Sequence, residues 1–171
     1  MAITTSITEA QVFTALRAFL LTIVDCEVVR LPANRVAMPV GDFIGLTPLL
    51  NTSLSTNVDS YAGTSKSIKR ASQFTVQVDC YGSGAGDRAT AITTLLRDGY
   101  GCEQFTASGF DIQPLYAGDA RQFPLVDGEA QYEERWTFDA VLQFNPVLTI
   151  TQQSALALAV NLKEVDRTYP P

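Results

Sequence analysis

A strict alternation of apolar and polar side chains over residues 74–81 constrains the fold more than any other feature of this sequence. Because successive side chains of a β-strand point to opposite faces of a sheet, this period of two predicts a half-buried antiparallel strand. Residues 135–144 alternate in the same way until Asn145 and Pro146 end the pattern. The chain is therefore expected to build a sheet with one face in a hydrophobic core. The residues expected on that face are Phe74, Val76, Val78, Cys80, Trp136, Phe138, Ala140, Leu142 and Phe144.

A helix is predicted over residues 7–25, because the apolar residues of this stretch recur at steps of three and four. Ser6 followed by Glu9 has the spacing of a capping box at the helix start, and Thr8 followed by Gln11 offers a second register. The apolar stripe consists of Val12, Phe13, Leu16, Phe19, Leu20, Ile23 and Val24.

A second helix is predicted from about Asp87, because an acidic residue in the first turn suits the helix dipole and an apolar stripe follows it. Gly99 or Gly101 is placed to cap its C-terminus. Two more strands are predicted. Residues 27–31 form one, which Pro32 ends, and residues 156–162 form the other. In the latter, Leu and Ala would also suit a helix, but the alternation of Leu156, Leu158, Val160 and Leu162 favours a strand.

A long hairpin or arm is predicted over residues 46–72, approximately. The alternation from Phe43 to Val58 is loose, and residues 57–67 are almost wholly small and polar. A segment of that composition buries little apolar surface, so we expect it to be flexible in the free subunit and ordered only against a partner. The alternative is a plain surface loop.

Together these elements predict an α+β fold, in which a mostly antiparallel sheet has two helices packed on one face and a long polar hairpin or arm. The length of 171 residues fits a single domain over residues 1–171, with a short extended C-terminal tail at residues 166–171. Hydrophobic residues make up 46% of the chain and charged residues 18%, so the chain can form a core without a metal or a disulfide.

The composition excludes several classes of function. The sequence has no histidine, which removes His-based catalytic triads, His-ligated metal sites and His pH switches. With 12 basic and 18 acidic residues the net charge is −6, which argues against a nucleic-acid clamp. Cys26, Cys80 and Cys102 are odd in number and lack C-x-x-C spacing, so we expect buried free thiols. Neither a basic leader nor an apolar run of about 20 residues is found, so we expect a protein made in the cytosol with no membrane partner.

Two clusters could carry chemistry, and neither has the pattern that the chemistry needs. Residues 82–87 join a strand to a helix, where a phosphate could bind, but Asp87 and Arg88 stand where a phosphate-binding loop needs Lys and Ser or Thr. A group of carboxylates could act as an acid–base pair or bind a hard cation, but it lacks the spacing of a calcium loop. That group is Asp127, Glu129, Glu133 and Glu134. We therefore expect no catalytic residue, no metal and no cofactor, and an acidic edge that faces solvent or an interface.

Residues 115–136, with the sequence LYAGDARQFPLVDGEAQYEERW, resemble the signature of a family of neck or tail terminator proteins of tailed bacteriophages. The supporting pieces are RVAMP at residues 35–39, GDFI at 41–44, QVDCYG at 77–82 and FNP at 144–146. The similarity extends from about residue 35 to residue 169, which is most of the chain. The central stretch is specific, whereas GDFI alone is weak.

The resemblance implies a structural virion protein with a tail-terminator-like fold. Such a protein forms a ring, usually of six subunits, that ends growth of the tail tube and joins the tail to the head. The implied partners are further copies of the chain, the tail-tube protein, the head connector or stopper protein and, in a contractile tail, the sheath. DNA would pass through the channel as non-specific cargo, and the protein would reside in the virion neck after assembly in the host cytoplasm.

The net charge is compatible with a channel. Six copies would carry a charge of about −36, and a negative wall keeps passing DNA from adhering to it. The alternative is that the acidic balance only keeps the protein in solution.

The parity of Arg135 predicts an interface. Arg135 directly precedes Trp136 in the strand, and neighbouring side chains of a strand point to opposite faces. We therefore expect Arg135 on the sheet face away from the core, with Glu133 on the same side. Arg135 and Arg121 can each hold a carboxylate with two hydrogen bonds, and Glu129, Glu133 or Glu134 are the candidate partners. The alternative is an intrachain pair worth about 0 to 1 kcal/mol. The interface reading predicts that Arg135→Ala leaves the monomer folded and blocks ring formation or tail joining. The residues predicted at a subunit or partner interface are Arg35, Asp42, Arg121, Glu129, Gln131, Tyr132, Glu133 and Arg135.

Two other functions fit the sequence. A head-completion stopper or a tail-tube protein would use the same kind of sheet-and-arm module, since a fold does not determine the position in the stack. A hydrolase built on the acidic cluster would need one deep pocket that holds two carboxylates, at least one of them with a raised pKa.

Overall fold

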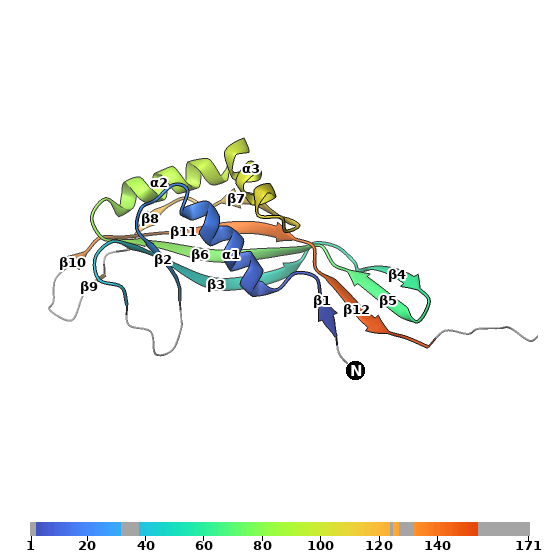
Figure 1. Ribbon diagram of the computed structural model, residues 1–171. Coiled ribbons are helices and arrows are strands. Elements are labelled where there is room, and N and C mark those ends of the chain that lie inside the picture. Colours follow the sequence, from blue (N-terminus) through green and yellow to red (C-terminus); the bar gives the residue numbers. More distant parts are fainter. Residues whose placement is uncertain (1–2, 32–37, 124, 127–131, 154–171) are drawn as a thin grey trace, which may run out of the picture.

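A computed structural model of the chain describes residues 3–31, 38–123, 125–126 and 132–153 (Figure 1). Within these ranges the chain forms three helices and twelve strands. The helices are α1 (Glu9–Leu20), α2 (Ala85–Leu96) and α3 (Gly99–Ala107). The strands are β1 (Thr4–Thr5), β2 (Glu27–Arg30), β3 (Phe43–Ser53), β4 (Val58–Ala62), β5 (Ser65–Lys69), β6 (Ser72–Tyr81), β7 (Ile112–Ala117), β8 (Arg121–Gln122), β9 (Leu125–Val126), β10 (Tyr132–Glu133), β11 (Arg135–Phe144) and β12 (Val147–Thr151).

The body of the molecule is a central sheet of order β2-β3-β6-β11-β7, with β8 also paired to β11. All its pairs are antiparallel except β2 with β3. The two long strands that the alternation predicts are confirmed as β6 and β11, the central pair. Their register places Trp136 opposite Cys80 and Phe138 opposite Val78, so the apolar residues of both strands share one face.

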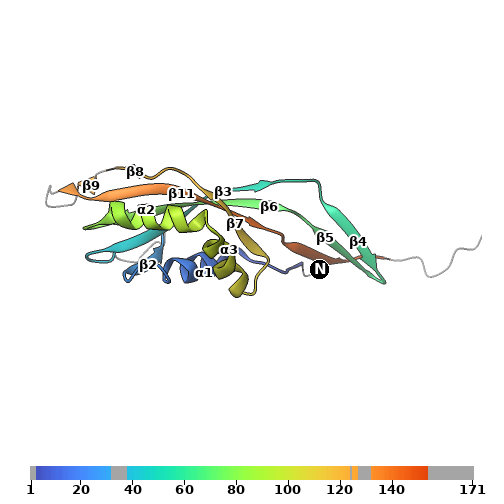
Figure 2. The ribbon, with the colours of Figure 1, turned by 90° about the horizontal axis from the view of Figure 1, so that it is seen from above.

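All three helices lie on that apolar face, as the two perpendicular views show (Figure 2). Phe19 of α1 contacts Phe105 of α3 with ring centroids 5.5 Å apart, while Phe13 meets Phe74 of the sheet edge-on. Gly86 in the first turn of α2 lies against the Trp136 indole, where a Cβ atom would come within 3.0 Å. One buried hydrophobic cluster joins the helices to the sheet, so the α+β class is confirmed.

The start of α1 follows the second of the two predicted capping registers. Thr8 is the N-cap, its hydroxyl accepts from the backbone N–H of Gln11, and the Gln11 side chain accepts from the Thr8 N–H. Ser6 is used elsewhere, because its hydroxyl accepts from the backbone N–H of Val147 on β12. Glu9 forms an ion pair with Arg30 instead of closing a capping box. The helix is also shorter than the predicted 7–25, since the chain turns after Leu20.

The third helix was not predicted from the sequence, and the expectation that Gly99 or Gly101 caps the second helix is wrong. Helix α2 ends at Leu96, and Asp98 then starts α3 by accepting a hydrogen bond from the N–H of Tyr100. Gly99 is the first residue of α3 and Gly101 is buried within it. A Cβ atom on Gly101 would lie 2.8 Å from the Leu95 carbonyl, so this glycine allows the two helices to pack closely.

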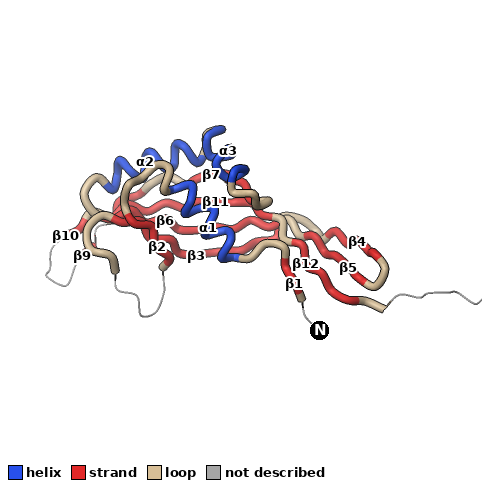
Figure 3. Tube along the Cα trace, viewed as in Figure 1, coloured by secondary structure: helices blue, strands red, loops and turns tan. Residues whose placement is uncertain are grey.

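A second sheet of order β1-β12-β5-β4 extends from one end of the body (Figures 1 and 3). We call the β4–β5 hairpin together with β12 the arm. The hairpin lies within residues 46–72, where the sequence predicts an arm, although the first part of that stretch pairs with β6 inside the central sheet. Strand β12 was not predicted. Pro146 does end β11, but the chain resumes at Val147 and pairs with β5.

Other predicted features have mixed outcomes. Strand 27–31 is confirmed as β2, which ends one residue earlier at Arg30. The predicted strand 156–162 and the tail 166–171 lie outside the described residues. Within the part of the chain that the structure covers, no helix is long and apolar enough to cross a membrane.

Candidate assembly interface

The face of the central sheet opposite the helices is the candidate interface, and we call it the open face. The strand register assigns its residues, because they alternate with those that face the helices. Arg121 and Phe123 join this face through the pairing of β8 with β11 and a hydrogen bond from the Phe123 N–H to the Arg135 carbonyl. The open face comprises Phe43, Gly45, Thr47, Leu50, Thr75, Gln77, Asp79, Tyr81, Tyr116, Arg121, Phe123, Arg135, Thr137, Asp139 and Val141.

Arg135 is held on the open face by Asp79 of the neighbouring strand. Its Nε and Nη2 atoms lie 3.1 and 2.9 Å from the same carboxylate oxygen of Asp79. The Gln77 amide nitrogen donates to both oxygens of that carboxylate, at 3.1 and 2.9 Å. The Asp79 side chain is only 2% exposed, so this is a buried carboxylate with three donor groups around it.

Two aromatic rings extend this cluster toward the edge of the sheet. The Arg135 guanidinium lies 5.5 Å from the centre of the Tyr81 ring, and Tyr81 stacks on Phe43 with centroids 4.4 Å apart. Burial raises the pKa of Tyr81 above its ordinary value of 10.0, and the nearby Asp79 carboxylate adds to the effect. The orientation predicted for Arg135 is therefore confirmed, but its partner is Asp79, not the acidic residues of its own segment.

The predicted acidic partners have other positions. Glu134 accepts a hydrogen bond of 2.9 Å from the Trp136 indole N–H, which draws it toward the helix side. Glu133 is exposed in the short strand β10, and Glu129 lies outside the described residues. Arg135 thus forms an ion pair within its own chain, which is the alternative to an interface contact that the sequence left open. Because Asp79 is buried, this pair differs from the weak, exposed pair that the sequence suggested.

Large apolar side chains are exposed on and beside the open face. Leu50 and Tyr116 lie at the two ends of one rung across the sheet, with Thr75 and Val141 between them. Near Leu49, which bulges out of β3, Phe123 helps to line a cavity of about 260 Å³. The exposed fractions of Leu49, Leu50, Tyr116 and Phe123 are between 50% and 58%.

Arg121 lines the same cavity as Phe123, together with Gln77, Thr137 and Asp139. Its side chain is exposed, and the structure assigns it no acidic partner among the described residues. The cavity therefore combines an aromatic ring and an accessible guanidinium in one place, and both Phe and Arg are enriched at protein interfaces.

Asp42 lies in a shallow hollow at one end of the sheet. Arg88 of α2 holds it, with Nη1 3.1 Å from Asp42 Oδ2, and Arg88 also donates to the Tyr81 carbonyl at 2.8 Å. Gly82 lies against Asp42 with φ +88°, and a Cβ atom there would approach Asp42 Oδ1 to 2.1 Å. Asp42 therefore anchors the turn that precedes α2. Glu133 and Glu134 line the same hollow of about 420 Å³.

The arm carries its own exposed apolar residues. Strand β4 is the outer strand of its sheet and is exposed along its whole length. Val58 and Tyr61 on this strand are 64% and 62% exposed. Lys66 of β5 pairs with Asp59 at 2.7 Å and lies over the Tyr61 ring. An edge strand with exposed apolar side chains is a template for pairing with another chain.

The remaining predicted interface residues are divided between described and undescribed parts of the chain. Tyr132 is in β10, where its backbone pairs with Val126 of β9. Arg35, Glu129 and Gln131 lie outside the described residues. The sequence reasoning missed the exposed apolar residues of the open face. For Leu50 the reason is the bulge in β3, which turns this residue outward and has no signal in the sequence.

The thiols and carboxylates form no further site in the described part of the chain. The three cysteines are free, with Cys80 buried, Cys26 half-buried and Cys102 exposed, so the expected burial holds for Cys80 and is wrong for Cys102. Burial raises the pKa of Cys80 to about 12 from the ordinary 9.0, and raises that of Cys26 as well. Among the described residues, no three Cys, Asp or Glu side chains are placed to hold a metal ion.

Comparison with known proteins identifies the family. A search of curated proteins finds no match to the chain. The family model described as phage neck terminator protein matches residues 10–167, nearly the whole sequence. The match includes the open face, the arm and the segment whose signature the sequence resembles. This chain belongs to the phage neck terminator protein family, whose members are structural proteins of the bacteriophage virion neck.

Proposed function

We propose that this chain is the repeated subunit of a six-membered ring that caps the tail tube and joins it to the head connector, with DNA passing through the channel. The observation that carries the proposal is the exposed apolar surface of the open face. Four large apolar side chains are about half exposed on or beside it, on a body whose other sheet face is covered by three helices. Soluble monomers rarely expose apolar residues in such a group, whereas assembly subunits do so at their contacts.

The arm supports a ring over a monomer. It projects from one end of the body (Figure 3). Among the described residues β4 is the edge strand of its sheet, and Tyr61 on this strand is exposed. Each subunit of a closed ring uses two different surfaces to contact its two neighbours. The open face and the arm are two such surfaces on one chain. Arg121 and the exposed Glu133 are proposed to contribute at the rims of these contacts, along with Tyr132.

The other partners follow from the place of the family in the virion. A ring at the neck has one side toward the tail tube and one toward the head connector or stopper, and in a contractile tail it also meets the sheath. The net charge of −6 per chain suits a channel through which DNA moves without specific contacts.

The test is complementation of a phage that lacks this reading frame. Without the protein we expect filled heads and separate tails in electron micrographs, and the wild-type chain should restore joined particles. Phe123→Ser should fail to restore them, because it removes an exposed ring of the open face without touching the core. Leu21→Ser is the matched control, since Leu21 is 42% exposed at the end of α1 on the helix side. Full joining by Phe123→Ser would contradict the role of the open face, and heads without any tail tubes in the phage that lacks the chain would be expected if the chain were itself the tube protein.

A further inference from the structure

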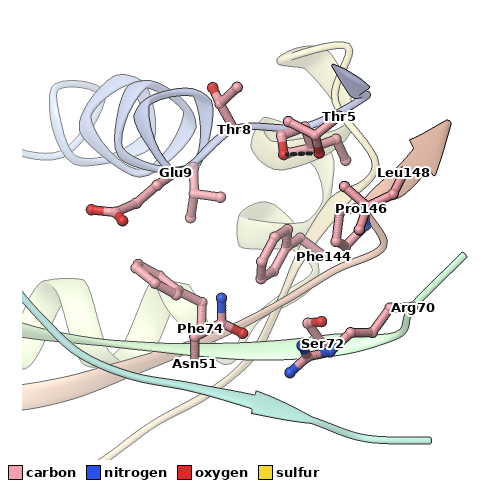
Figure 4. A pocket seen from close by; sticks show the side chains of 12 residues that line it. Thr5, Thr8, Glu9, Asn51, Arg70, Ser72, Phe74, Phe144, Pro146 and Leu148 are labelled. Carbon is pink, nitrogen blue, oxygen red and sulfur yellow. Dashed lines mark hydrogen bonds between the residues drawn. The ribbon is translucent and has the colours of Figure 1, made fainter. Parts of the chain in front are cut away.

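A groove lies where the arm meets the body. It has a volume of about 390 Å³ and runs between the start of α1, the ends of β3 and β11, and the beginnings of β6 and β12 (Figure 4). Most of the surface of its walls is apolar. Apolar residues of the wall include Ile7, Val12, Phe74, Phe144, Pro146 and Leu148.

The chemistry of the groove favours a peptide over water. Its volume equals that of about a dozen water molecules at about 30 Å³ each, but the apolar wall offers them few hydrogen bonds. Phe74 and Phe144 meet edge-on at 6.1 Å and form the floor, and Leu148 remains 39% exposed beside them. Phe74 and Phe144 are only 5% and 6% exposed, so an aliphatic side chain from outside the described fold would meet the surface of this floor and Leu148 beside it.

Arg70 adds a polar requirement to the groove. Its Nε atom is buried and has no hydrogen-bond partner among the described residues, although its backbone N–H is satisfied by the Pro146 carbonyl. A buried donor without an acceptor is unfavourable, so an occupant that brings an oxygen to this point is favoured. An extended peptide does so, because it carries a carbonyl at every residue.

The sequence contains a segment of this chemistry. Residues 156–162 alternate Leu156, Leu158, Val160 and Leu162 with smaller residues, and they lie in the 18 residues beyond the described part of the chain. Fully extended, 18 residues span up to about 60 Å, so the segment can reach well beyond its point of attachment. Its apolar side chains on one parity match a groove with an apolar floor.

The direction of β12 favours the groove of another subunit over that of the same subunit. Pro146 and Leu148 line the groove, and β12 runs from there to the hairpin turn, where the Gln152 N–H bonds to the Thr64 carbonyl. The chain thus leaves the described fold at the far end of the arm. A return along β12 is obstructed, because β5 occupies one edge over its full length and β1 occupies Leu148 and Thr149 on the other.

We infer that the groove at the root of the arm receives residues 156–162 from a neighbouring copy of this chain, with the apolar side chains on the Phe74–Phe144 floor and a peptide oxygen near Arg70. This inference rests on the proposed function, since it requires a neighbouring subunit in the ring. Each subunit then makes this contact twice: its residues 156–162, which follow the arm, enter the groove of one neighbour, and its own groove at the root of the arm receives residues 156–162 of another.

The experiment uses the full-length chain with the photo-crosslinking amino acid benzoylphenylalanine at position 158. Equal amounts of unlabelled and 15N-labelled chains are mixed before assembly, irradiated, and analysed by mass spectrometry of crosslinked peptides. We expect crosslinks to the groove around Leu148 and Phe144, half of them between chains of different isotope content. The matched control places the same amino acid at Asn161, whose opposite parity directs it away from the floor.

A variant of the groove wall sharpens the test. Leu148→Lys places a charge at the exposed edge of the floor and is expected to lower the crosslinking yield about tenfold. Leu21→Lys, at a comparably exposed residue outside the groove, should leave the yield unchanged. Thermal unfolding of both variants confirms that each is folded.

The other outcomes overturn the inference. Crosslinks found only between chains of the same isotope content would mean that the segment occupies its own groove. Crosslinks to the open face or to no defined surface would remove the groove as its site. Native mass measured on the same sample separates the two claims. A six-fold assembly without groove crosslinks refutes this inference and leaves the proposed ring intact, whereas the absence of any assembly refutes both.

Discussion

Arg135 on β11 holds the buried carboxylate of Asp79 on β6 through two hydrogen bonds to a single oxygen, at 3.1 and 2.9 Å. The two residues lie on the face of the sheet that no helix of the described chain covers. Because the carboxylate is 2% exposed, the arginine compensates a charge that could not otherwise remain there. Arg135 thus stabilises the folded subunit itself, independently of any contact between subunits.

Replacing Arg135 tests this assignment. Arg135→Ala should lower the free energy of unfolding by about 2 kcal/mol, because it removes two charge-assisted hydrogen bonds and leaves Gln77 as the remaining donor to Asp79. This differs from the sequence-based expectation of an undisturbed monomer. Urea unfolding of the purified chain measures the loss. The double variant Arg135→Leu, Asp79→Asn should recover part of it, and a single variant as stable as the wild type would refute the structural role.

Gly82 is required by its conformation and by its neighbour. Gly82→Ala should destabilise the subunit by at least about 2 kcal/mol, since φ is +88° and the new Cβ atom would meet Asp42 at 2.1 Å. Gly63→Ala in the hairpin turn is the matched control. It has φ +56° and open space around it, so its cost should be only about 1 kcal/mol. If Gly82→Ala and Gly63→Ala lower the stability equally in thermal unfolding, the contact with Asp42 does not contribute to the cost.

The capping register of α1 can be measured directly. Thr8→Ala should cost about 1 kcal/mol in stability, because it leaves a backbone donor of the first turn without its partner. Thr14→Ala in the exposed part of the same helix is the control, and alanine's higher helix propensity should leave stability unchanged or slightly raised. No loss at Thr8, measured by chemical denaturation, would contradict the capping box.

Cys80 makes stability depend on alkaline pH. Its pKa is about 12 in the folded chain and near 9.0 when unfolded, so the folded state retains the proton longer. The stabilisation of the folded state by the protonated thiol is complete below about pH 9 and is lost as the pH rises toward 12. The loss in the free energy of unfolding is about 1 kcal/mol at pH 10. Cys80→Ala should show a shallower decline of unfolding free energy between pH 8 and 10. Identical slopes would refute the burial of the thiol.

Much of the body could be predicted from the sequence because its signals are periodic. The alternation in β6 and β11 and the helical stripe of α1 directly reflect which side chains enter the core. Predictions were less successful where short-range chemistry decides. Asp98 restarts a helix two residues after Leu96 ends one, and the sequence pattern of the two helices is nearly continuous.

The candidate interface was harder to predict than the fold. Parity correctly directed Arg135 away from the core, but the partner Asp79 lies 56 residues away in the sequence and is brought beside it only by strand pairing. Leu50 keeps the parity of the buried Leu46, yet a bulge after Pro48 turns it to the open face. Register shifts of this kind arise from tertiary packing, and a single sequence does not reveal them.

The mass of the native assembly tests the central claim, that this chain is a ring subunit, most directly. The full-length protein is measured over about a hundredfold range of concentration, alone and with purified tail tubes, since assembly by mass action grows with concentration. We predict a six-fold species that Phe123→Ser weakens and Leu21→Ser does not. A chain that remains a monomer or a stable dimer under every condition, tail tubes included, would contradict the account.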